Sequence, residues 1–527
     1  MIAGILAEIP NNTEGGANLA DFNILTPDNL NDLIYTPFQQ ALGEAEHRRL
    51  QKQHANYLYY AGYQHRGTSD ELVKAEDLER PPGLDYDPTR YATNYFKAFI
   101  KRKARWQMGG KHGVDVDARV IDPAEEAAKS DYKPSPAQQA EYDRAEALET
   151  LIYRLWRENR MRERLLQGAR DRLIAGRVAV KILFNQRTGK LKWAWHPDTE
   201  TFPIYSEDDF EDLIACHFVK ELTDDKTGET LYQKQTFELI DGVCWLSEGV
   251  YNAELKLVRT ITEKASMGLD FIPVVLVPIE DLAGEPAINT EIDDMRSQTD
   301  VLNAMNEDAI DSLKFEMFGI TAVINAPAGT AERMEIAPGA VVGITGTSEL
   351  TPDVKKVEGG FRWNDAFKAQ YDRVKGALHE ITAIPQMAIN DLNFGGMNTD
   401  ALHIVFHDII SETEEHWLAW EPRLQELHEK SIRYLQARAS SKPFAYDKDA
   451  LNLIGDNYEH EIKFALPLPD NRKDLVELLT LEMDAGLESQ VGALARAGVE
   501  NTAVKRQEIE NERKRAQIQS DPYSGED

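Results

Sequence analysis

Residues 363–439 read WNDAFKAQYDRVKGALHEITAIPQMAINDLNFGGMNTDALHIVFHDIISETEEHWLAWEPRLQELHEKSIRYLQARA. The first part predicts a helix because its large apolar residues recur every three or four positions: Trp363, Phe367, Tyr371, Val374, Leu378 and Ile381. Pro385 ends this helix, since the residue before a proline avoids the α region. A loop with two adjacent glycines follows, and Thr399 is a suitable N-cap for a second helix to about Ala439. That helix would span ~60 Å and kink at Pro422.

A helix, a small α/β module and a β-rich region precede this stretch. From Thr290, one helical face is apolar and the opposite face is acidic, because Ile292, Met295, Leu302, Met305, Ala309, Leu313 and Met317 step by three, four or seven. Residues 319–360 contain short apolar runs and turns, such as ITAVINAP and GAVVGITG. Alternating apolar residues on both sides of NQRTGK predict a β-hairpin from Val178 to Trp195, and further antiparallel strands are expected up to residue 280. We therefore predict an α+β chain that is mainly helical, with a β-rich domain.

Helical patterns also occur towards the two ends of the chain. Helices are predicted over Leu25–Gln64 and from Ala140 to about Ala175, with a mobile excursion between Val116 and Gln139. Asn94–Met108 predicts a short helix in which lysines and arginines alternate with aromatic residues. Such a helix binds nucleic acid or packs its aromatic face inward with its cations in water, and we favour packing because charge runs are usually solvated faces.

The C-terminal part is predicted to continue with one strand and then helices. Tyr458–Phe464 predicts a short strand, residues 471–517 predict helices rich in Glu, Lys and Arg, and residues 518–527 should be disordered.

Composition excludes several classes of protein. The length of 527 residues corresponds to about three or four domain-sized units. No apolar run approaches the ~20 residues of a membrane span, and the N-terminus lacks the basic region of a signal peptide. Cys216 and Cys244 form no CxxC motif, so a disulfide framework or a structural zinc site is not expected and the reducing cytoplasm is the simplest compartment. The net charge of −31 repels nucleic acid at long range, although solubility alone also accounts for it.

The sequence contains no strong catalytic motif. It lacks a P-loop, a GxGxxG after a strand, GxSxG and HExxH. His403 and His407 have the i, i+4 spacing of zinc ligands, with Asp400 nearby, but no glutamate completes a hydrolase motif. Asp115 and Asp117 form a DxD that is a very weak signal for a divalent cation. We expect no enzyme activity, no metal and no cofactor.

The order of these parts resembles the portal proteins of tailed double-stranded DNA bacteriophages of the siphophage type. The most specific stretch is ITAIPQMAINDLNFGGMNTDALHIVF, which is similar to the family's proline, Phe-Gly-Gly loop and Ala-Leu helix start. Met397 and Asn398 stand where the family usually has Ser-Gly. Four further stretches are similar to other parts of the family, in the same order: LYYAGYQ, NYFKAFIKRKARWQMGG, FIPVVLVP and YEHEIKFALPLPDN, at 58–64, 94–110, 271–278 and 458–471.

The resemblance implies a homo-oligomeric ring, typically a dodecamer, at one capsid vertex of the virion, assembled in the host cytoplasm. The implied parts are wing (1–289 and 400–470), stem helices (290–318 and 361–384), clip (319–360), tunnel loop (385–399) and crown (471–517). The implied partners are DNA in the channel, the terminase large subunit, the major capsid and scaffolding proteins and the head–tail adaptor, with no membrane. The implied DNA-facing loop residues are Asn390, Asp391, Leu392, Asn393, Phe394, Gly395, Gly396, Met397 and Asn398, and the charged stem residues are Asp300, Glu307, Asp311, Lys368, Arg373 and Lys375.

The loop composition suits a channel through which DNA slides. No Lys or Arg lies between Gln386 and Asp400, and each phosphate contact by such a residue would strengthen binding and oppose movement. Glycines allow the loop to change shape. Two alternative functions remain open: another multimeric virion component, such as an adaptor or scaffold, and a metal-dependent hydrolase built on Asp400, His403 and His407.

Overall fold

The computed structural model describes most of the chain between residues 44 and 509. The described residues are 44–68, 70–82, 86–116, 134–206, 209, 212–224, 227–279, 290–317, 320–325, 351, 353–357, 363–386, 403–467, 472–485, 493–494, 497 and 509. They divide into two compact units, of which the first runs to Gln386 and resumes over Asp408–Leu466, and the second comprises 387–407 and 467–527. Helix α12 (Arg472–Asp484) and residues 403–407 belong to the second unit, and the other helices and strands that the structure describes belong to the first.

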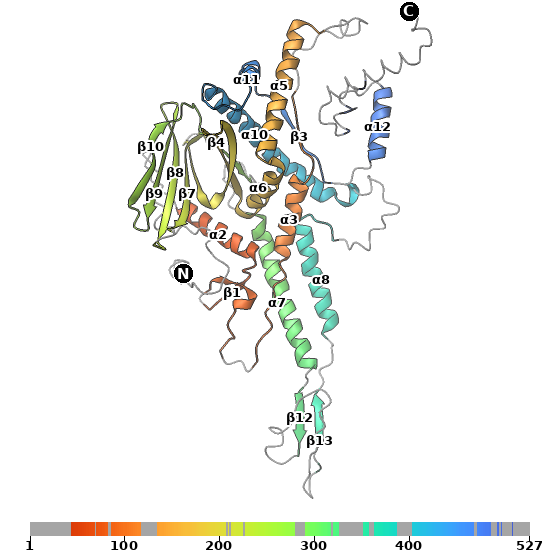
Figure 1. Cartoon of the computed structure of the whole chain (residues 1–527). Helices are drawn as coiled ribbons and strands as arrows, with labels where there is room; N and C mark the ends of the chain where they lie inside the picture. Colours follow the sequence, from red (N-terminus) through yellow and green to blue (C-terminus); the bar gives the residue numbers. More distant parts are fainter. Residues whose placement is uncertain are drawn as a thin grey trace, which may run out of the picture. The chain divides into compact units, whose positions relative to one another are not determined.

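Two antiparallel sheets form the β-rich region (Figure 1). The larger sheet has the order β10-β9-β8-β7-β6, built from Leu257–Ser266, Val243–Asn252, Thr230–Ile240, Leu213–Thr223 and Thr201–Tyr205. The smaller sheet has the order β11-β4-β5, from Val274–Pro278, Arg177–Asn185 and Lys190–Pro197. The hairpin and the antiparallel strands predicted up to residue 280 are thus confirmed, but the strands divide between two sheets.

The smaller sheet is covered by the long helix α10 (His407–Ala437). Trp420 is fully buried, and its ring centroid lies 6.4 Å from that of Trp195 on β5. The Trp193 indole donates to the Ser431 hydroxyl at 2.9 Å, which satisfies a polar group that would otherwise be buried without a partner. Pro422 lies inside α10, as the sequence indicates. The predicted start at Thr399 lies outside the described residues, and a turn at Phe406 separates the helical residues 403–405 from α10.

The helix predicted from Ala140 to Ala175 is wrong as a single element. The structure has α5 (Pro136–Glu158) and α6 (Met161–Ala175), and Arg160 between them has the left-handed φ of 52°. The buried Asn159 side chain donates to the Leu155 carbonyl and accepts the Trp193 amide of β5. A contact with a distant strand therefore ends a helix that the local pattern would continue. The helix also begins at Pro136, inside the predicted excursion, with Ser135 as its N-cap.

The described residues also form several further helices and strands. They are α2 (Glu44–Ala61), β1 (His65–Arg66), β2 (Leu72–Val73), η2 (Ala75–Asp77), α3 (Tyr95–Met108), β3 (Gly113–Asp115), η3 (Asp198–Glu200), α11 (Lys448–Ile454) and β14 (Glu461–Lys463). The predicted C-terminal strand is confirmed as β14, and it pairs with β3, which the sequence did not predict. None of the helices in the described ranges combines the length and apolarity needed to cross a bilayer.

A buried carboxylate joins the N-terminal helix to both sheets. Asp198, between β5 and β6, is 1% exposed and accepts hydrogen bonds from Arg49 and Gln53 on α2 and from Arg177 at the start of β4. A buried carboxylate without such partners would be strongly disfavoured. Burial alone would lower the pKa of Arg177, but Asp198 beside it raises that pKa. The cluster therefore holds α2, β4 and the sheet junction together as a charged unit.

Replacing Asp198 tests this cluster. Asp198→Asn removes the carboxylate that binds Arg177 and one of the two carboxylates that bind Arg49, the other being Glu46. We expect it to lower the free energy of unfolding by ~3–5 kcal/mol, because a buried ion pair is broken. Chemical denaturation followed by circular dichroism measures the change. Glu254→Gln is the matched control, because Glu254 and Lys256 are 69% and 75% exposed, and it should cost under ~1 kcal/mol. Equal effects of the two substitutions would contradict the role given to Asp198.

Candidate functional site

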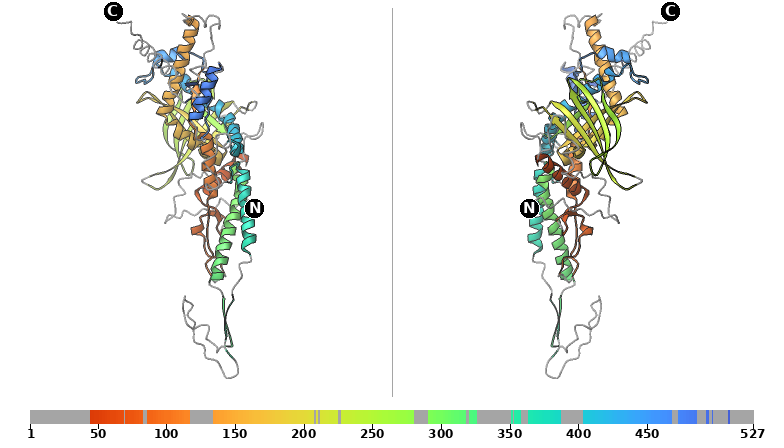
Figure 2. Two further views of the ribbon diagram at one scale, coloured as in Figure 1. Left: turned by 90° about the vertical axis from the view of Figure 1, so that its right-hand side faces the viewer. Right: turned by 90° about the vertical axis from the view of Figure 1, so that its left-hand side faces the viewer.

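The two predicted helices on either side of the α/β module form an antiparallel pair (Figures 1 and 2). They are α7 (Glu291–Met317) and α8 (Asn364–Ile381). Leu302 on α7 and Leu378 on α8 are buried, as their apolar stripes predict. An aromatic row of Trp363, Phe367 and Tyr371 continues along α8, with centroid separations of 5.7 and 5.8 Å. The chain leaves and re-enters this pair through β12 (Ile320–Ile324) and β13 (Asp353–Val357), which pair antiparallel.

The acidic face of α7 binds a segment from the N-terminal part of the chain, which we call the strap (residues 56–68 and 86–94). The outgoing part of the strap contacts α7 turn by turn through side chains: Arg296 with Asn56 at 2.9 Å, Asp300 with the Tyr59 hydroxyl at 2.6 Å, Asn303 with Gln64 at 3.0 Å and Glu307 with His65 at 2.9 Å.

The returning part of the strap contacts the same helix through its backbone. Its amides donate to α7 side chains, from Thr93 to Asn303, from Tyr91 to Glu307 and from Thr89 to Asp311, at 2.8–3.0 Å. The strap therefore follows α7 over about four turns.

These contacts alter the titration of the carboxylates. Burial raises the pKa of Asp300, although the Tyr59 hydroxyl opposes the shift. At Asp311, burial also acts to raise the pKa, but the Thr89 hydroxyl and amide and Lys314 outweigh it, so the pKa is lowered. A lowered carboxyl pKa means that Asp311 adds stability above its ordinary value of 3.8 and loses that contribution as the pH falls below it.

The predicted acidic stem residues therefore serve the fold of the subunit itself. Asp300, Glu307 and Asp311 all bind the strap, and of these Glu307 and Asp311 are half-buried. Asp294 and Asp308 on the same helix are exposed. The sequence did not predict the strap because its partners lie more than 200 positions away, and only the tyrosine cluster at Tyr57–Tyr63 marks it. Another contact that the sequence missed joins α3 to α8, where the Tyr95 and Tyr371 hydroxyls lie 3.0 Å apart.

The predicted basic stem residues lie on α8. Lys368 and Arg373 are exposed and Lys375 is half-buried, and none of the three forms an ion pair with another residue that the structure describes. Lys375 and Arg102 of α3 both lie close enough to His379 to lower its pKa, after burial, which is the larger cause. A small cationic cluster therefore marks the end of α8.

The end of α8 turns the chain towards the predicted tunnel loop. The His379 ring nitrogen Nδ1 lies 2.9 Å from the Ile384 carbonyl and donates to it, and the Thr382 hydroxyl donates to the Leu378 carbonyl at 2.8 Å. Ala383 takes a left-handed φ of 53°, so the helical conformation does not continue to Pro385. All the predicted DNA-facing loop residues, Asn390–Asn398, lie outside the described residues.

The basic helix α3 packs aromatic side chains inward, which is the alternative that we favoured from the sequence. Phe96, Phe99 and Ile100 are buried, and Arg102 and Arg105 are exposed. Lys103 is the exception, since it is 3% exposed and binds Glu412 of α10. Phe96 and Phe99 of α3 therefore belong to the core, and Tyr95 and Trp106 are half-buried.

The candidate metal ligands are not assembled by the described part of the chain. His403 and His407 are both exposed, and Asp400 lies outside it. No group of three or more potential metal ligands occurs among the described residues. Asp115 is in β3, where it lies opposite Glu461 of β14 in the strand pairing. Its carboxylate oxygen lies 3.7 Å from Nζ of Lys463. Asp117 lies outside the described residues. The hydrolase hypothesis thus gains no support from the geometry.

Comparison with protein families decides the identity. Residues 41–519 match the family model described as phage portal protein, SPP1 Gp6-like, which is nearly the whole chain. This chain belongs to the phage portal protein family. The family is structural and not enzymatic, and its members are components of the phage capsid. No curated protein matches the chain significantly. The mixed helix and sheet composition agrees with the predicted α+β class.

The strap contacts yield a prediction for this portal. Asp311→Ala removes the acceptor for the Thr89 amide and hydroxyl, and we expect it to destabilise the subunit by ~1–2 kcal/mol. Hydrogen exchange should rise in residues 86–93 and along α7. Asp308→Ala is the matched control, one turn away and exposed. If both variants exchange like the wild type at residues 86–93, the strap does not depend on the acidic face.

Proposed function

We propose that copies of this chain form a ring, a dodecamer, at one vertex of the phage capsid. In this proposal the ring is the passage for genome DNA during packaging and ejection. The family match over residues 41–519 carries the proposal. The antiparallel pair of α7 and α8 is the stem, residues 1–289 and 400–470 are the wing, and residues 471–517 are the crown.

An exposed stripe on α7 supports association of the stem with a second copy. Asp294, Ser297, Val301, Ala304 and Asp308 are all exposed and step by three and four residues, so they lie on one helical face. Val301 is 45% exposed, and its neighbours Ser297 and Ala304 are small enough to let another helix approach closely. The strap covers a different face of α7, so it leaves this stripe accessible.

Charge favours a conduit that does not retain DNA. A dodecamer of chains with a net charge of −31 each carries roughly −370, which disfavours adsorption of a polyanion. The loop at 385–399 has no Lys or Arg after Gln386, so we assign it weak contacts with the duplex through amide and apolar side chains. The cations at the end of α8 precede the loop in the sequence and are not part of it.

Other partners follow from the same proposal. The clip, residues 319–360, docks the terminase large subunit during packaging and the head–tail adaptor afterwards. The wing contacts the major capsid and scaffolding proteins. Assembly takes place in the host cytoplasm, and the mature ring belongs to the virion.

A substitution in the exposed stripe of α7 tests ring formation directly. Val301→Glu places a charge on this face, and we expect the variant to remain a folded monomer when the wild type forms rings. Mass photometry and negative-stain microscopy give the oligomeric state, and circular dichroism confirms folding. Val258→Glu is the matched control because Val258 is 58% exposed on edge strand β10. A monomeric wild type would overturn the ring, and ring formation by Val301→Glu would remove the stripe from the interface.

The flexibility of the loop is tested by packaging. Gly395→Pro combined with Gly396→Pro restricts the backbone, and we expect normal rings with a markedly slower DNA packaging rate. The control is the double Gly→Ala variant, which restricts the backbone less. A normal packaging rate in the double proline variant would show that a change of loop shape is not required.

A further inference from the structure

Buried histidines hold one short segment of the wing at both of its ends. We call residues 458–465 the latch segment; it contains β14 and is the last described part of the first unit before the chain enters the second. Strand pairing with β3 covers only residues 461–463. The attachment of the remaining residues therefore depends on side chains.

At the first end, two histidines form a directional chain of hydrogen bonds. The Trp156 indole donates to Nε2 of His428 at 2.7 Å, so this nitrogen carries no proton. The proton of neutral His428 is then on Nδ1, which donates to Nε2 of His460 at 2.8 Å. For the same reason Nδ1 of His460 donates to the Tyr458 carbonyl at 2.7 Å. The indole donor thus fixes one tautomer for both imidazoles, and both are neutral.

At the second end, a third histidine accepts a backbone amide. Nδ1 of His112 lies 3.2 Å from the Ala465 nitrogen, so an unprotonated Nδ1 is required. The Phe464 ring stacks on Trp417 with centroids 5.0 Å apart and lies 5.4 Å from the His112 ring. The backbone packs closely here, since a Cβ on Gly110 would lie 1.7 Å from the Ala465 carbonyl oxygen.

We propose that His112, His428 and His460 form a proton-sensitive latch, which holds residues 458–465 when all three are neutral and releases them when they are protonated. A proton added to either member of the His428–His460 pair places two N–H groups face to face. A proton on Nδ1 of His112 removes the acceptor of the Ala465 amide and places a second N–H group against it. Release would detach the segment through which the wing continues into the C-terminal unit.

The direction of the pH effect follows from burial. Burial lowers the pKa of His112 from 6.5 to about 4, lowers that of His460, and lowers that of His428 well below 6.5. A released histidine has the ordinary value, so it binds protons that the latched form does not. The latch is therefore fully stable above about pH 6.5 and weakens progressively as the pH falls below that value. At about pH 5.5 each histidine contributes up to about a tenfold weakening.

Some groups near the three histidines raise their pKa values and others lower them. The Tyr458 carbonyl and Glu421 of α10 favour protonated His460, whereas His460 disfavours a charge on His428 and Arg162 disfavours a charge on His112. The Met108 backbone favours protonated His112. Trp193 of β5, with its ring centroid 5.9 Å from that of His428, adds no charge.

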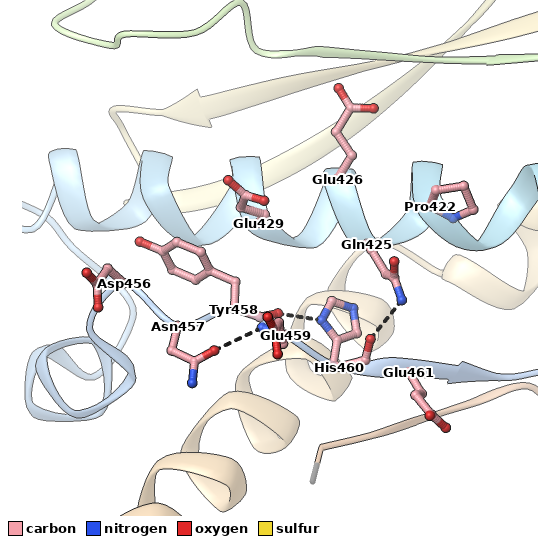
Figure 3. Close-up of a pocket in the computed structure, with 10 residues that line it drawn as sticks. All are labelled: Pro422, Gln425, Glu426, Glu429, Asp456, Asn457, Tyr458, Glu459, His460 and Glu461. Atoms are coloured by element: carbon pink, nitrogen blue, oxygen red, sulfur yellow. Dashed lines mark hydrogen bonds between the residues drawn. The ribbon is translucent and has the colours of Figure 1, made fainter. Parts of the chain in front are cut away.

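The outer side of the latch segment lines a groove that provides further acidic groups. This groove, of about 900 Å³, lies between α10 and residues 456–461 (Figure 3). The carboxylates of Glu426, Glu429, Asp456, Glu459 and Glu461 line it together with His460. The Gln425 amide donates to the His460 carbonyl at 2.8 Å, and Arg144 of α5 donates to the Asn457 carbonyl at 3.2 Å. Neither bond involves an imidazole, so protonation of the histidines does not break either bond directly, and both bonds oppose release.

Hydrogen exchange of the full chain tests the latch. Protection factors, which correct for the pH dependence of intrinsic exchange, are compared at about pH 8 and about pH 5.5. We expect wild-type protection in residues 458–465 to fall more than about 100-fold, with a clearly smaller fall in β8, where Thr236 is bonded to the single buried histidine His217. His112→Gln combined with His460→Gln keeps an acceptor at both places but removes two titrating groups. We expect its protection to fall no more than about tenfold.

A matched control separates the latch from general acid sensitivity. His217 is 1% exposed on β7, and burial lowers its pKa to about 3, but it does not contact the latch segment. His217→Gln should lose protection in residues 458–465 like the wild type. If the double variant does not fold, imidazole nitrogen shifts of the wild type show whether protonation accompanies the loss. Protection that persists at about pH 5.5, falls equally in the double variant, or falls no more than that of β8 would overturn the latch.

Discussion

The buried carboxylate of Asp198 is the interaction on which the arrangement of this subunit depends. It is enclosed by two arginines and a glutamine from elements far apart in the sequence, and it can be buried only when all of them are in place. Helix α2 is thereby fixed against both sheets. The same helix then presents Asn56 and Tyr59 to α7, so the position of the proposed stem follows from a charge cluster in the β-rich region.

The acidic face of α7 shows why composition alone misleads about function. A row of carboxylates in a chain of net charge −31 suggests a surface that repels DNA. Asp300, Glu307 and Asp311 instead accept hydrogen bonds from the strap, and this use is structural. The exposed stripe from Asp294 to Asp308 lies on a different face, and it is the part of α7 that is free to meet a second subunit. Stability and the proposed assembly thus involve separate faces of one helix.

The elements of the fold that follow from local pattern could be predicted, and those set by distant contacts could not. The helices α3, α7 and α8 and the strands from β4 to β11 follow from apolar periodicity. The break at Asn159 and Arg160 depends on the Trp193 amide, which local periodicity does not encode. The strap and the histidine latch escaped prediction for the same reason, since each joins residues that are tens to hundreds of positions apart. At the candidate site, helices α7 and α8 follow from their apolar stripes, the contacts of Asp300, Glu307 and Asp311 with the strap do not follow from local pattern, and the loop at 390–398 lies beyond the described residues.

The central claim is that α7 and α8 surround the DNA passage of the portal ring. The most direct measurement is a cryo-electron microscopy reconstruction of the portal vertex in a DNA-filled particle. The account predicts a ring of this chain at a single vertex, with α7, α8 and residues 385–399 nearest to the DNA density and the β6–β10 sheet farther away. A ring in which the sheet faces the DNA, or a chain located elsewhere in the particle, would contradict it.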